Sequence, residues 1–172
     1  MQKIVITGPE STGKTTLAEA LSKHYNCPVV KEYAVEYLEN TAGKYTYRDL
    51  LKIAKGQIAT EEKICHNTVS EIGICDTDLI TIKIWSKVKY NKVSRWIMKT
   101  IRERHYDHYL LCAPDIQWHY DKFRENPNDR DWLFTLYENE LKKYKKDYSI
   151  IRGKGIQRVQ SAIEIIDSLY KK

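Results

Sequence analysis

Residues 8–15 read Gly-Pro-Glu-Ser-Thr-Gly-Lys-Thr and match the pattern G-x-x-x-x-G-K-[ST] in full. A β-branched run precedes them and a helix-like segment follows, which is the context that a phosphate-binding loop requires. Gly8 and Gly13 permit a loop whose backbone N–H groups surround an anion. We expect Lys14 to reach the terminal phosphates of ATP and the Thr15 hydroxyl to bind Mg²⁺. The predicted nucleotide-binding residues of this loop are Gly8, Glu10, Ser11, Thr12, Gly13, Lys14, Thr15 and Thr16.

Two carboxylates follow the apolar run 72–75. Asp76 stands at the end of this run, where a Walker B acid holds the metal ion directly or through water. Asp78, two residues further on, has two open interpretations: it contributes to the same site, or it caps the helix that follows.

Glu32 follows the apolar run 27–31 and precedes a short helix-like segment. A carboxylate at the end of a parallel strand points into the cleft that holds the phosphates. It can accept the proton of a substrate hydroxyl as that hydroxyl attacks the γ-phosphorus. Glu36 lies one helical turn further on and shares a face with Glu32. The alternative is that Glu32 only caps the helix.

A polar segment at about 114–131 combines cations with aromatic side chains. Its cations are Lys122, Arg124 and Arg130, and its aromatic residues are Trp118, Tyr120 and Phe123. Phosphoryl transfer spreads negative charge over the equatorial oxygens, so a basic lid that closes over them and excludes water would assist it. We predict catalytic roles for Arg124 and Arg130; the alternative is an ordinary polar loop with packed aromatic residues.

Arg158 follows the turn that ends the apolar run 148–151. It is predicted to stack over adenine or to reach the phosphates; a surface position is the alternative.

These candidate residues need a scaffold that brings strand ends together. Strand-like runs occur at residues 3–7, 27–31, 72–75, 109–112 and 148–151. Helix-like segments separate them, and parallel neighbours need such crossovers to return the chain. The sequence therefore predicts a single α/β domain over residues 1–172. Its expected architecture has three layers, a parallel sheet of these five strands with helices on both faces and the ligand site at the carboxyl ends of the strands.

The longest predicted helix begins after Thr46, which is expected to cap it. Its apolar residues, at spacings of 3, 4 and 7, predict one buried face. That face is formed by Leu51, Ala54, Ile58 and Cys65.

Composition excludes several classes. With 42% apolar and 30% charged residues the chain is a globular protein. No apolar run approaches the length of a membrane span, and the N-terminal residues lack the features of a secretory signal, so we expect a cytoplasmic protein. The net charge of +6 suits either an anionic small substrate or nucleic acid, and the charge alone does not distinguish them. Nucleic-acid binding is not expected, because the C-terminal lysines alternate with acidic residues, as on a solvated helix face.

The segments GPESTGKTTL, KEYAVEYLE, ICDTDLIT, YLLCAPDIQW and IRGKGIQR occur in an order that resembles the NadR-like ribosylnicotinamide kinase family of P-loop proteins. The resemblance implies the three-layer P-loop nucleotide-kinase fold with a five-stranded parallel sheet, and ATP and Mg²⁺ as cosubstrate and cofactor. It also implies phosphorylation of the 5′-hydroxyl of nicotinamide riboside in NAD salvage. It assigns nucleotide and metal to Lys14, Thr15 and Asp76, the ribose end to Glu32, and the lid to Arg124 and Arg130. Larger family members also carry a nucleotidyltransferase domain with an H-x-G-H motif; this chain has none, so we expect it not to make the dinucleotide.

One departure from the family pattern concerns the base of the acceptor. Where the family places an aromatic residue just before the acid, this chain has Lys31. An ammonium there is unfavourable for the pyridinium cation of nicotinamide riboside, which favours an aromatic face. Candidate replacement rings are Tyr33, Trp85, Tyr90 and Trp118.

The predicted acceptor-binding residues are Glu32, Tyr33, Glu36, Asp78, Trp85 and Trp118. Three alternative functions stay open: a kinase of another nucleoside or nucleotide, a regulatory ATPase module without a small acceptor, and a nucleic-acid-binding protein. The sequence does not predict the oligomeric state.

Overall fold

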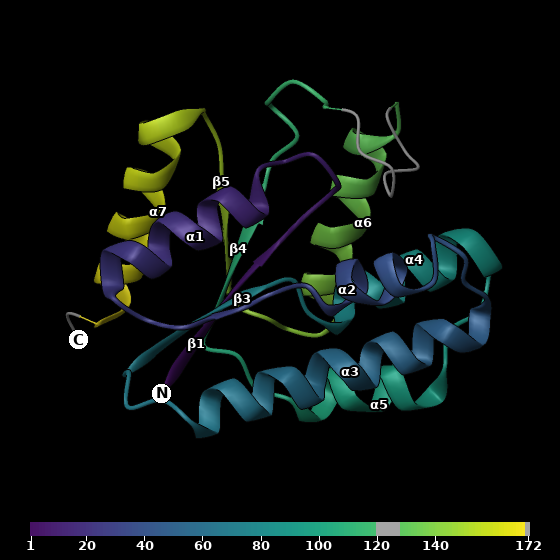
Figure 1. Cartoon of the computed structure of the whole chain (residues 1–172). Helices are drawn as coiled ribbons and strands as arrows, with labels where there is room; N and C mark the ends of the chain where they lie inside the picture. The colour runs from purple at the N-terminus through teal and green to yellow at the C-terminus, as the bar shows by residue number, and fades with distance from the viewer. Residues whose placement is uncertain (120–127, 171–172) are drawn as a thin grey trace.

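A parallel sheet forms the middle layer of the structure (Figure 1). The computed structural model describes residues 1–119 and 128–170. Within these residues the sheet has five strands in the order β2-β3-β1-β4-β5, and every neighbouring pair is parallel. The strands are β1 (Gln2–Thr7), β2 (Val29–Val30), β3 (Ile72–Asp76), β4 (His108–Cys112) and β5 (Tyr148–Ile151). The predicted five-stranded parallel sheet is confirmed, although β2 is shorter than the run 27–31.

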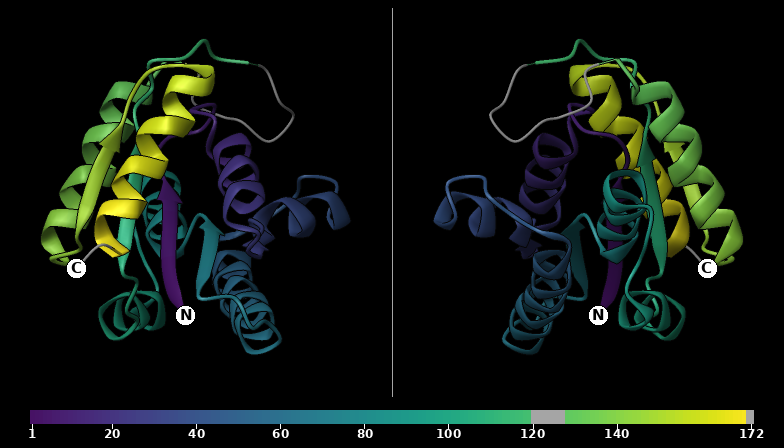
Figure 2. Two further views of the ribbon diagram at one scale, coloured as in Figure 1. Left: turned by 90° about the vertical axis from the view of Figure 1, so that its left-hand side faces the viewer. Right: turned by 90° about the vertical axis from the view of Figure 1, so that its right-hand side faces the viewer.

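Helices cover both faces of the sheet (Figure 2). The helices in the described residues are α1 (Lys14–Tyr25), α2 (Tyr33–Asn40), α3 (Tyr47–His66), α4 (Leu79–Tyr90), α5 (Arg95–Glu103), α6 (Arg130–Lys143) and α7 (Gly155–Tyr170). α1 and α7 pack on one face, against Ile4, Ile6 and Leu110. The remaining helices pack on the other face, against Val5 and Tyr109. Because strand side chains alternate and both faces are covered, the middle residues of the central strands are apolar.

The start of α3 is fixed by the predicted cap. The Thr46 backbone N–H donates to the Asp49 carboxylate at 2.8 Å, as part of a capping box. The predicted buried face was partly wrong, since Leu51 and Cys65 are only half-buried. The residues buried on α3 are Leu50, Ile53, Ala54, Gln57, Ile58 and Glu61.

The two polar members of that face are buried because each is hydrogen-bonded. Gln57 accepts from the Tyr33 backbone N–H at 2.7 Å. Glu61 accepts from Lys3, Arg104 and Tyr106. A pattern of apolar residues does not reveal polar residues that are buried through hydrogen bonds. The predicted buried face of α3 was therefore displaced around the helix toward Leu51.

The predicted lid at 114–131 lies only partly within the described residues. Tyr120, Lys122, Phe123 and Arg124 fall outside them. Arg130 is the first residue of α6 and so belongs to a helix rather than to a loop. Within the described chain, none of the helices combines the length and the apolar character that crossing a bilayer requires.

Candidate active site

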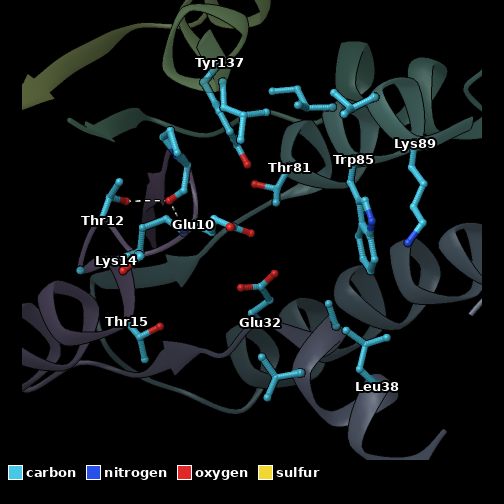
Figure 3. Close-up of a pocket in the computed structure, with 18 of the residues that line it drawn as sticks. Glu10, Thr12, Lys14, Thr15, Glu32, Leu38, Thr81, Trp85, Lys89 and Tyr137 are labelled. Carbon is cyan, nitrogen blue, oxygen red and sulfur yellow. Dashed lines mark hydrogen bonds between the residues drawn. The ribbon is translucent and has the colours of Figure 1, made fainter. Parts of the chain in front are cut away.

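A cavity of about 810 Å³ opens beside the carboxyl ends of the central strands (Figure 3). This volume is within the range of pockets that bind small molecules. Its walls come from the loop after β1, the start of α2, the loop between α2 and α3, and the inner sides of α4 and α6. The lining residues are Pro9, Glu10, Ser11, Thr12, Gly13, Lys14, Thr15, Thr16, Glu32, Ala34, Val35, Leu38, Glu39, Gly43, Tyr45, Thr81, Ile84, Trp85, Val88, Lys89, Leu133 and Tyr137.

The loop between β1 and α1 has the backbone conformation that its glycines permit. Gly8 has a φ of 133°, and a Cβ at this position would lie 2.7 Å from the Cys112 carbonyl oxygen. Gly13, the N-cap of α1, has a φ of 74° in the left-handed region. The Thr12 hydroxyl closes the loop by donating to the Pro9 carbonyl at 2.8 Å. This conformation agrees with the predicted phosphate-binding loop.

Thr15 and Asp76 meet beneath the loop. The Thr15 hydroxyl donates to Asp76 Oδ2 at 2.7 Å, while the other carboxylate oxygen, Oδ1, is buried without a hydrogen-bond partner among the described residues. Burial raises the pKa of Asp76, and the Thr15 hydrogen bond opposes that shift. A buried carboxylate oxygen that lacks a partner is unfavourable unless a cation or water satisfies it. The pair therefore fits Mg²⁺, which prefers oxygen ligands.

The Lys14 side chain lies over the same loop. Its ammonium donates to the Pro9 carbonyl at 2.7 Å. It lines the cavity across from Glu32 (Figure 3).

Glu32 occupies the N-cap position of α2, yet its side chain makes no capping hydrogen bond. Its carboxylate points into the middle of the cavity (Figure 3). Burial raises the pKa of Glu32 to about 7; the Lys14 ammonium opposes this shift and the Asp76 carboxylate reinforces it. The side-chain capping alternative is therefore not what the structure shows. This places a carboxylate of raised pKa beside the phosphate-binding loop.

The position of Glu32 is set by the neighbouring residue. The Tyr33 backbone N–H donates to Gln57 on α3, and the Tyr33 ring lies directly over Gly56. These two contacts attach the start of α2 to α3. Tyr33 therefore supports the site from outside the cavity, and the prediction that it contacts the acceptor is corrected.

The far end of the cavity is formed by Tyr45, Trp85 and Lys89. Trp85 Nε1 donates to the Tyr45 hydroxyl at 2.9 Å, and the two rings meet edge to face with centroids 4.6 Å apart. The Lys89 ammonium lies 4.3 Å from the centroid of the Tyr45 ring and donates to its hydroxyl. Trp85, a predicted acceptor-binding residue, does line the cavity.

Tyr45 and Lys89 were missed by sequence reasoning. Lys89 lies one helical turn after Trp85 on α4, a spacing that could have indicated a shared face. Tyr45 comes from the loop between α2 and α3 and had no local signal.

Asp78 lies at the start of α4 and is not among the residues that line the cavity. It caps the helix by accepting from the Ile80 N–H at 3.1 Å, and its other oxygen accepts from the Tyr109 hydroxyl at 2.9 Å. Burial raises the pKa of Asp78 to about 6, and the Tyr109 hydrogen bond opposes the shift. Of its two interpretations the structure supports the cap, and its predicted contact with the acceptor is corrected.

Two further predicted acceptor residues also lie outside the lining of the cavity. Glu36 is exposed on α2 because the helix turns it toward solvent, whereas Ala34 and Leu38 face inward. Trp118 is half-buried in the segment after β4.

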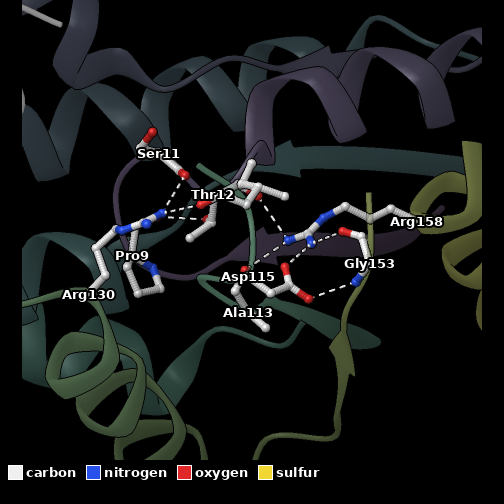
Figure 4. A network of polar contacts seen from close by, with 9 residues as sticks. Pro9, Ser11, Thr12, Ala113, Asp115, Arg130, Gly153 and Arg158 are labelled. Atoms are coloured by element: carbon white, nitrogen blue, oxygen red, sulfur yellow. Dashed lines mark hydrogen bonds and ion pairs between the residues drawn. The ribbon is translucent and has the colours of Figure 1, made fainter. Parts of the chain in front are cut away.

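Two guanidinium groups lie on the outer side of the phosphate-binding loop (Figure 4). Arg130 donates to the carbonyls of Ser11 at 3.1 Å and Ile116 at 2.9 Å. Arg158 is buried and donates to the Thr12 carbonyl at 2.9 Å. Neither arginine lines the cavity. The alternative of a surface position for Arg158 is wrong, because the residue is buried. Its Nη1 and Nη2 groups donate to protein acceptors, whereas Nε has no partner among the described residues.

The parallel sheet, the glycine-rich loop at the end of β1 and the acid at the end of β3 define a domain with the P-loop kinase fold. The chain belongs to the AAA domain family, whose model matches residues 3–158. Two curated relatives are the trifunctional NAD biosynthesis/regulator proteins NadR of Escherichia coli K12 and Salmonella typhimurium. Each is 26% identical over 128 residues, which cover 72% of this chain and 31% of the relative. The chain thus spans about a third of the length of these relatives.

Solved structures confirm the fold. The crystal structure of NadR protein in complex with NR aligns with a TM-score of 0.84 at 23% identity, over 98% of this chain and 49% of that chain. The deoxyadenosine kinase of M. mycoides, solved with products, aligns with a TM-score of 0.66 at 17% identity, over 97% of this chain and all of that chain. These similarities confirm the resemblance that the sequence motifs indicated.

Proposed function

We propose that this protein transfers the γ-phosphate of ATP to the 5′-hydroxyl of a nucleoside, with nicotinamide riboside as the first candidate acceptor. The observation that supports the proposal most strongly is the placement of Glu32. Its carboxylate faces the phosphate-binding loop across one cavity. The far end of this cavity carries an aromatic ring that can contact a nucleobase. A nucleoside bound between these two ends would place its 5′-hydroxyl next to both the γ-phosphate of ATP and the Glu32 carboxylate.

The proposed reaction uses the residues as follows. Backbone N–H groups of the loop and the Lys14 ammonium bind the phosphates of ATP. Mg²⁺, bound by Thr15 and Asp76, would neutralise part of the phosphate charge. As the acceptor oxygen bonds to the γ-phosphorus, the bond from that phosphorus to the bridging oxygen breaks and ADP leaves. Glu32 takes the proton of the hydroxyl, a task suited to a carboxylate whose pKa is about 7.

Nicotinamide riboside is the first candidate acceptor for two reasons: the names of similar proteins, and an aromatic side chain at the acceptor end of the cavity. Both curated relatives are named for NAD biosynthesis, and one similar structure was solved with NR. Trp85 lines the acceptor end and offers an aromatic face of the kind that a pyridinium favours. The reaction would then be a step of NAD salvage.

A different nucleoside is the second candidate, and two ammonium groups favour it. Lys31 stands where the family places an aromatic residue, and Lys89 lies at the end of the cavity where the base would bind. The Lys89 ammonium makes a cation–π contact with the Tyr45 ring, which is the contact that the pyridinium of nicotinamide riboside would otherwise make there.

We further propose that residues 1–172 act as one kinase domain in the cytoplasm. The four cysteines are free thiols, which supports a reducing compartment.

An acceptor panel tests the proposal. ADP release is measured with ATP and Mg²⁺ in the presence of nicotinamide riboside, purine and pyrimidine nucleosides and their monophosphates, with Lys14→Ala as the inactive control. One nucleoside should raise the rate well above the rate without acceptor. A rate that no acceptor changes would favour the regulatory ATPase, and steeply salt-dependent gel shifts would favour nucleic-acid binding.

A further inference from the structure

The phosphate-binding loop has two sides. The carbonyls of Ser11 and Thr12 accept from Arg130 and Arg158 (Figure 4), and neither arginine is among the residues that line the cavity. In a trans peptide the C=O and the following N–H point in opposite directions, and the described chain has no cis peptide bond. The N–H groups of Thr12 and Gly13 therefore point to the side where an anion would bind.

Arg158 is tied to the loop and to its surroundings by four hydrogen bonds, which it donates to four different residues. Nη2 donates to the carbonyls of Thr12 at 2.9 Å and Ala113 at 3.2 Å. Nη1 donates to Asp115 at 2.8 Å and to the Gly153 carbonyl at 2.8 Å. Asp115 in turn accepts from the Gly153 N–H at 2.7 Å. One guanidinium thus joins the phosphate-binding loop, the end of β4 and the turn after β5.

The burial of this charge is unusual for a residue that only fills space. The Arg158 side chain is 6% exposed, and its carboxylate partner Asp115 is 30% exposed. Burying a guanidinium is unfavourable unless hydrogen bonds and an opposite charge compensate for lost water. One of the compensating groups is the Thr12 carbonyl, which belongs to the phosphate-binding loop itself. The positive charge also polarises the Thr12 carbonyl, which makes the Gly13 N–H a stronger donor.

We propose that Arg158 is a positioning residue for ATP: from the outer side of the loop it orients and polarises the peptides whose N–H groups bind the triphosphate. The proposal rests on the proposed function, since it needs ATP at this loop. Asp115 holds the guanidinium in place. Arg130 acts in the same way on the neighbouring Ser11 carbonyl.

Kinetics of Arg158→Met and Arg158→Lys test this role, with Arg152→Met as the matched control. Arg152 is exposed at the end of β5 and has no hydrogen bond among the described residues. The expected result for Arg158→Met is a KM for ATP raised about tenfold or more, as expected when hydrogen bonds to a charged group are lost. The KM for the nucleoside should stay unchanged. Arg158→Lys, which keeps the charge but loses the fork, should fall between Arg158→Met and the wild type.

Several outcomes decide the matter. A purely structural role would lower the folded fraction, and hence kcat, without raising the KM for ATP alone; that result would overturn the proposal. If Arg158→Met does not fold, Arg158→Lys carries the test, and a wild-type KM for ATP in that variant would equally overturn it. Failure of the wild type to bind ATP in the presence of Mg²⁺, measured by calorimetry, would instead contradict the proposed function.

Discussion

At the scale of single residues, the Glu32 carboxylate is the group with the least structural explanation. It makes no side-chain cap to α2 and has no hydrogen-bond partner among the described residues, although burial raises its pKa to about 7. A carboxylate that only stabilised the fold would be expected to be paired. The proposed role as the base for the acceptor hydroxyl explains why this carboxylate is left without a partner.

Glu32→Gln should lower kcat by about 10²- to 10⁴-fold, because the amide cannot accept the proton. In the wild type, kcat/KM should rise as the pH increases through about 7, since the base acts when ionised. Glu36→Gln is the matched control: it makes the same change one helical turn away, at an exposed position. Steady-state rates of the three proteins between pH 5.5 and 8.5 provide the measurement. A variant with wild-type kcat would remove Glu32 from the chemistry.

The same substitution should stabilise the fold at high pH. The folded-state pKa of Glu32 lies above its ordinary value, so the folded chain binds more protons than the unfolded chain between about pH 4.5 and pH 7. Stability from this group is therefore lost as the pH rises through about 7. Glu32→Gln should melt at a higher temperature than the wild type at pH 8, with a smaller difference at pH 5. Equal melting temperatures at pH 8 would argue against a buried charge.

The positive charge of Lys89 should affect whether the protein prefers a cationic or an uncharged nucleoside as the acceptor. Lys89→Met removes the ammonium from the end of the cavity and keeps the length of the side chain. The kcat/KM ratio of nicotinamide riboside to an uncharged nucleoside should then rise about twofold or more, since a cation–π contact is worth roughly 0.5–2 kcal/mol. Lys87→Met, on an exposed position of the same helix outside the cavity, should leave the ratio unchanged. An equal ratio in Lys89→Met and the wild type would exclude this role.

At the scale of elements, the placement of α2 against α3 holds Glu32 at the cavity. The Tyr33 ring lies over Gly56, where an added Cβ would come within 2.1 Å of the ring. The absence of a side chain at this helical position lets the two helices approach. The contact explains why a glycine, unfavourable in the middle of a helix, is present in α3.

Gly56→Ala should therefore destabilise the protein, although alanine in place of a helical glycine usually stabilises by roughly 0.5–1 kcal/mol. It should also raise the KM for the nucleoside, because Glu32 moves with Tyr33. In a Tyr33→Ala background the clash is gone, and Gly56→Ala should raise the melting temperature. Thermal unfolding of the four proteins in this cycle measures the coupling. Stabilisation by Gly56→Ala in the wild-type background would contradict the packing described.

Local sequence patterns predicted the helices and strands, but not the hydrogen bonds between residues distant in the sequence that connect them. The cap at Thr46 was predictable because it depends on neighbouring residues. The buried face of α3 was not, because Gln57 and Glu61 are buried through hydrogen bonds to residues distant in the sequence.

At the scale of the whole molecule, the site forms where strand ends converge. The phosphate-binding loop follows β1 directly, Glu32 lies two residues after β2, and Asp76 is the last residue of β3. The predicted topology was therefore enough to place them at one edge of the sheet. Tyr45 and Arg158 come from a loop and a helix whose positions depend on tertiary packing. The sequence therefore predicted the residues at the phosphate end of the cavity well. It did not predict Tyr45 at the acceptor end or the hydrogen bond from Arg158 to the loop.

The most direct test of a shared cavity is the fate of the γ-phosphate. Wild-type protein is incubated with Mg²⁺ and ATP labelled in the γ-phosphate, together with the best acceptor of the panel, and the labelled products are separated. The account predicts label in the nucleoside 5′-monophosphate in amounts equal to the ADP formed, and its loss in Lys14→Ala. Label recovered only as inorganic phosphate, at a rate that the nucleoside does not change, would contradict it.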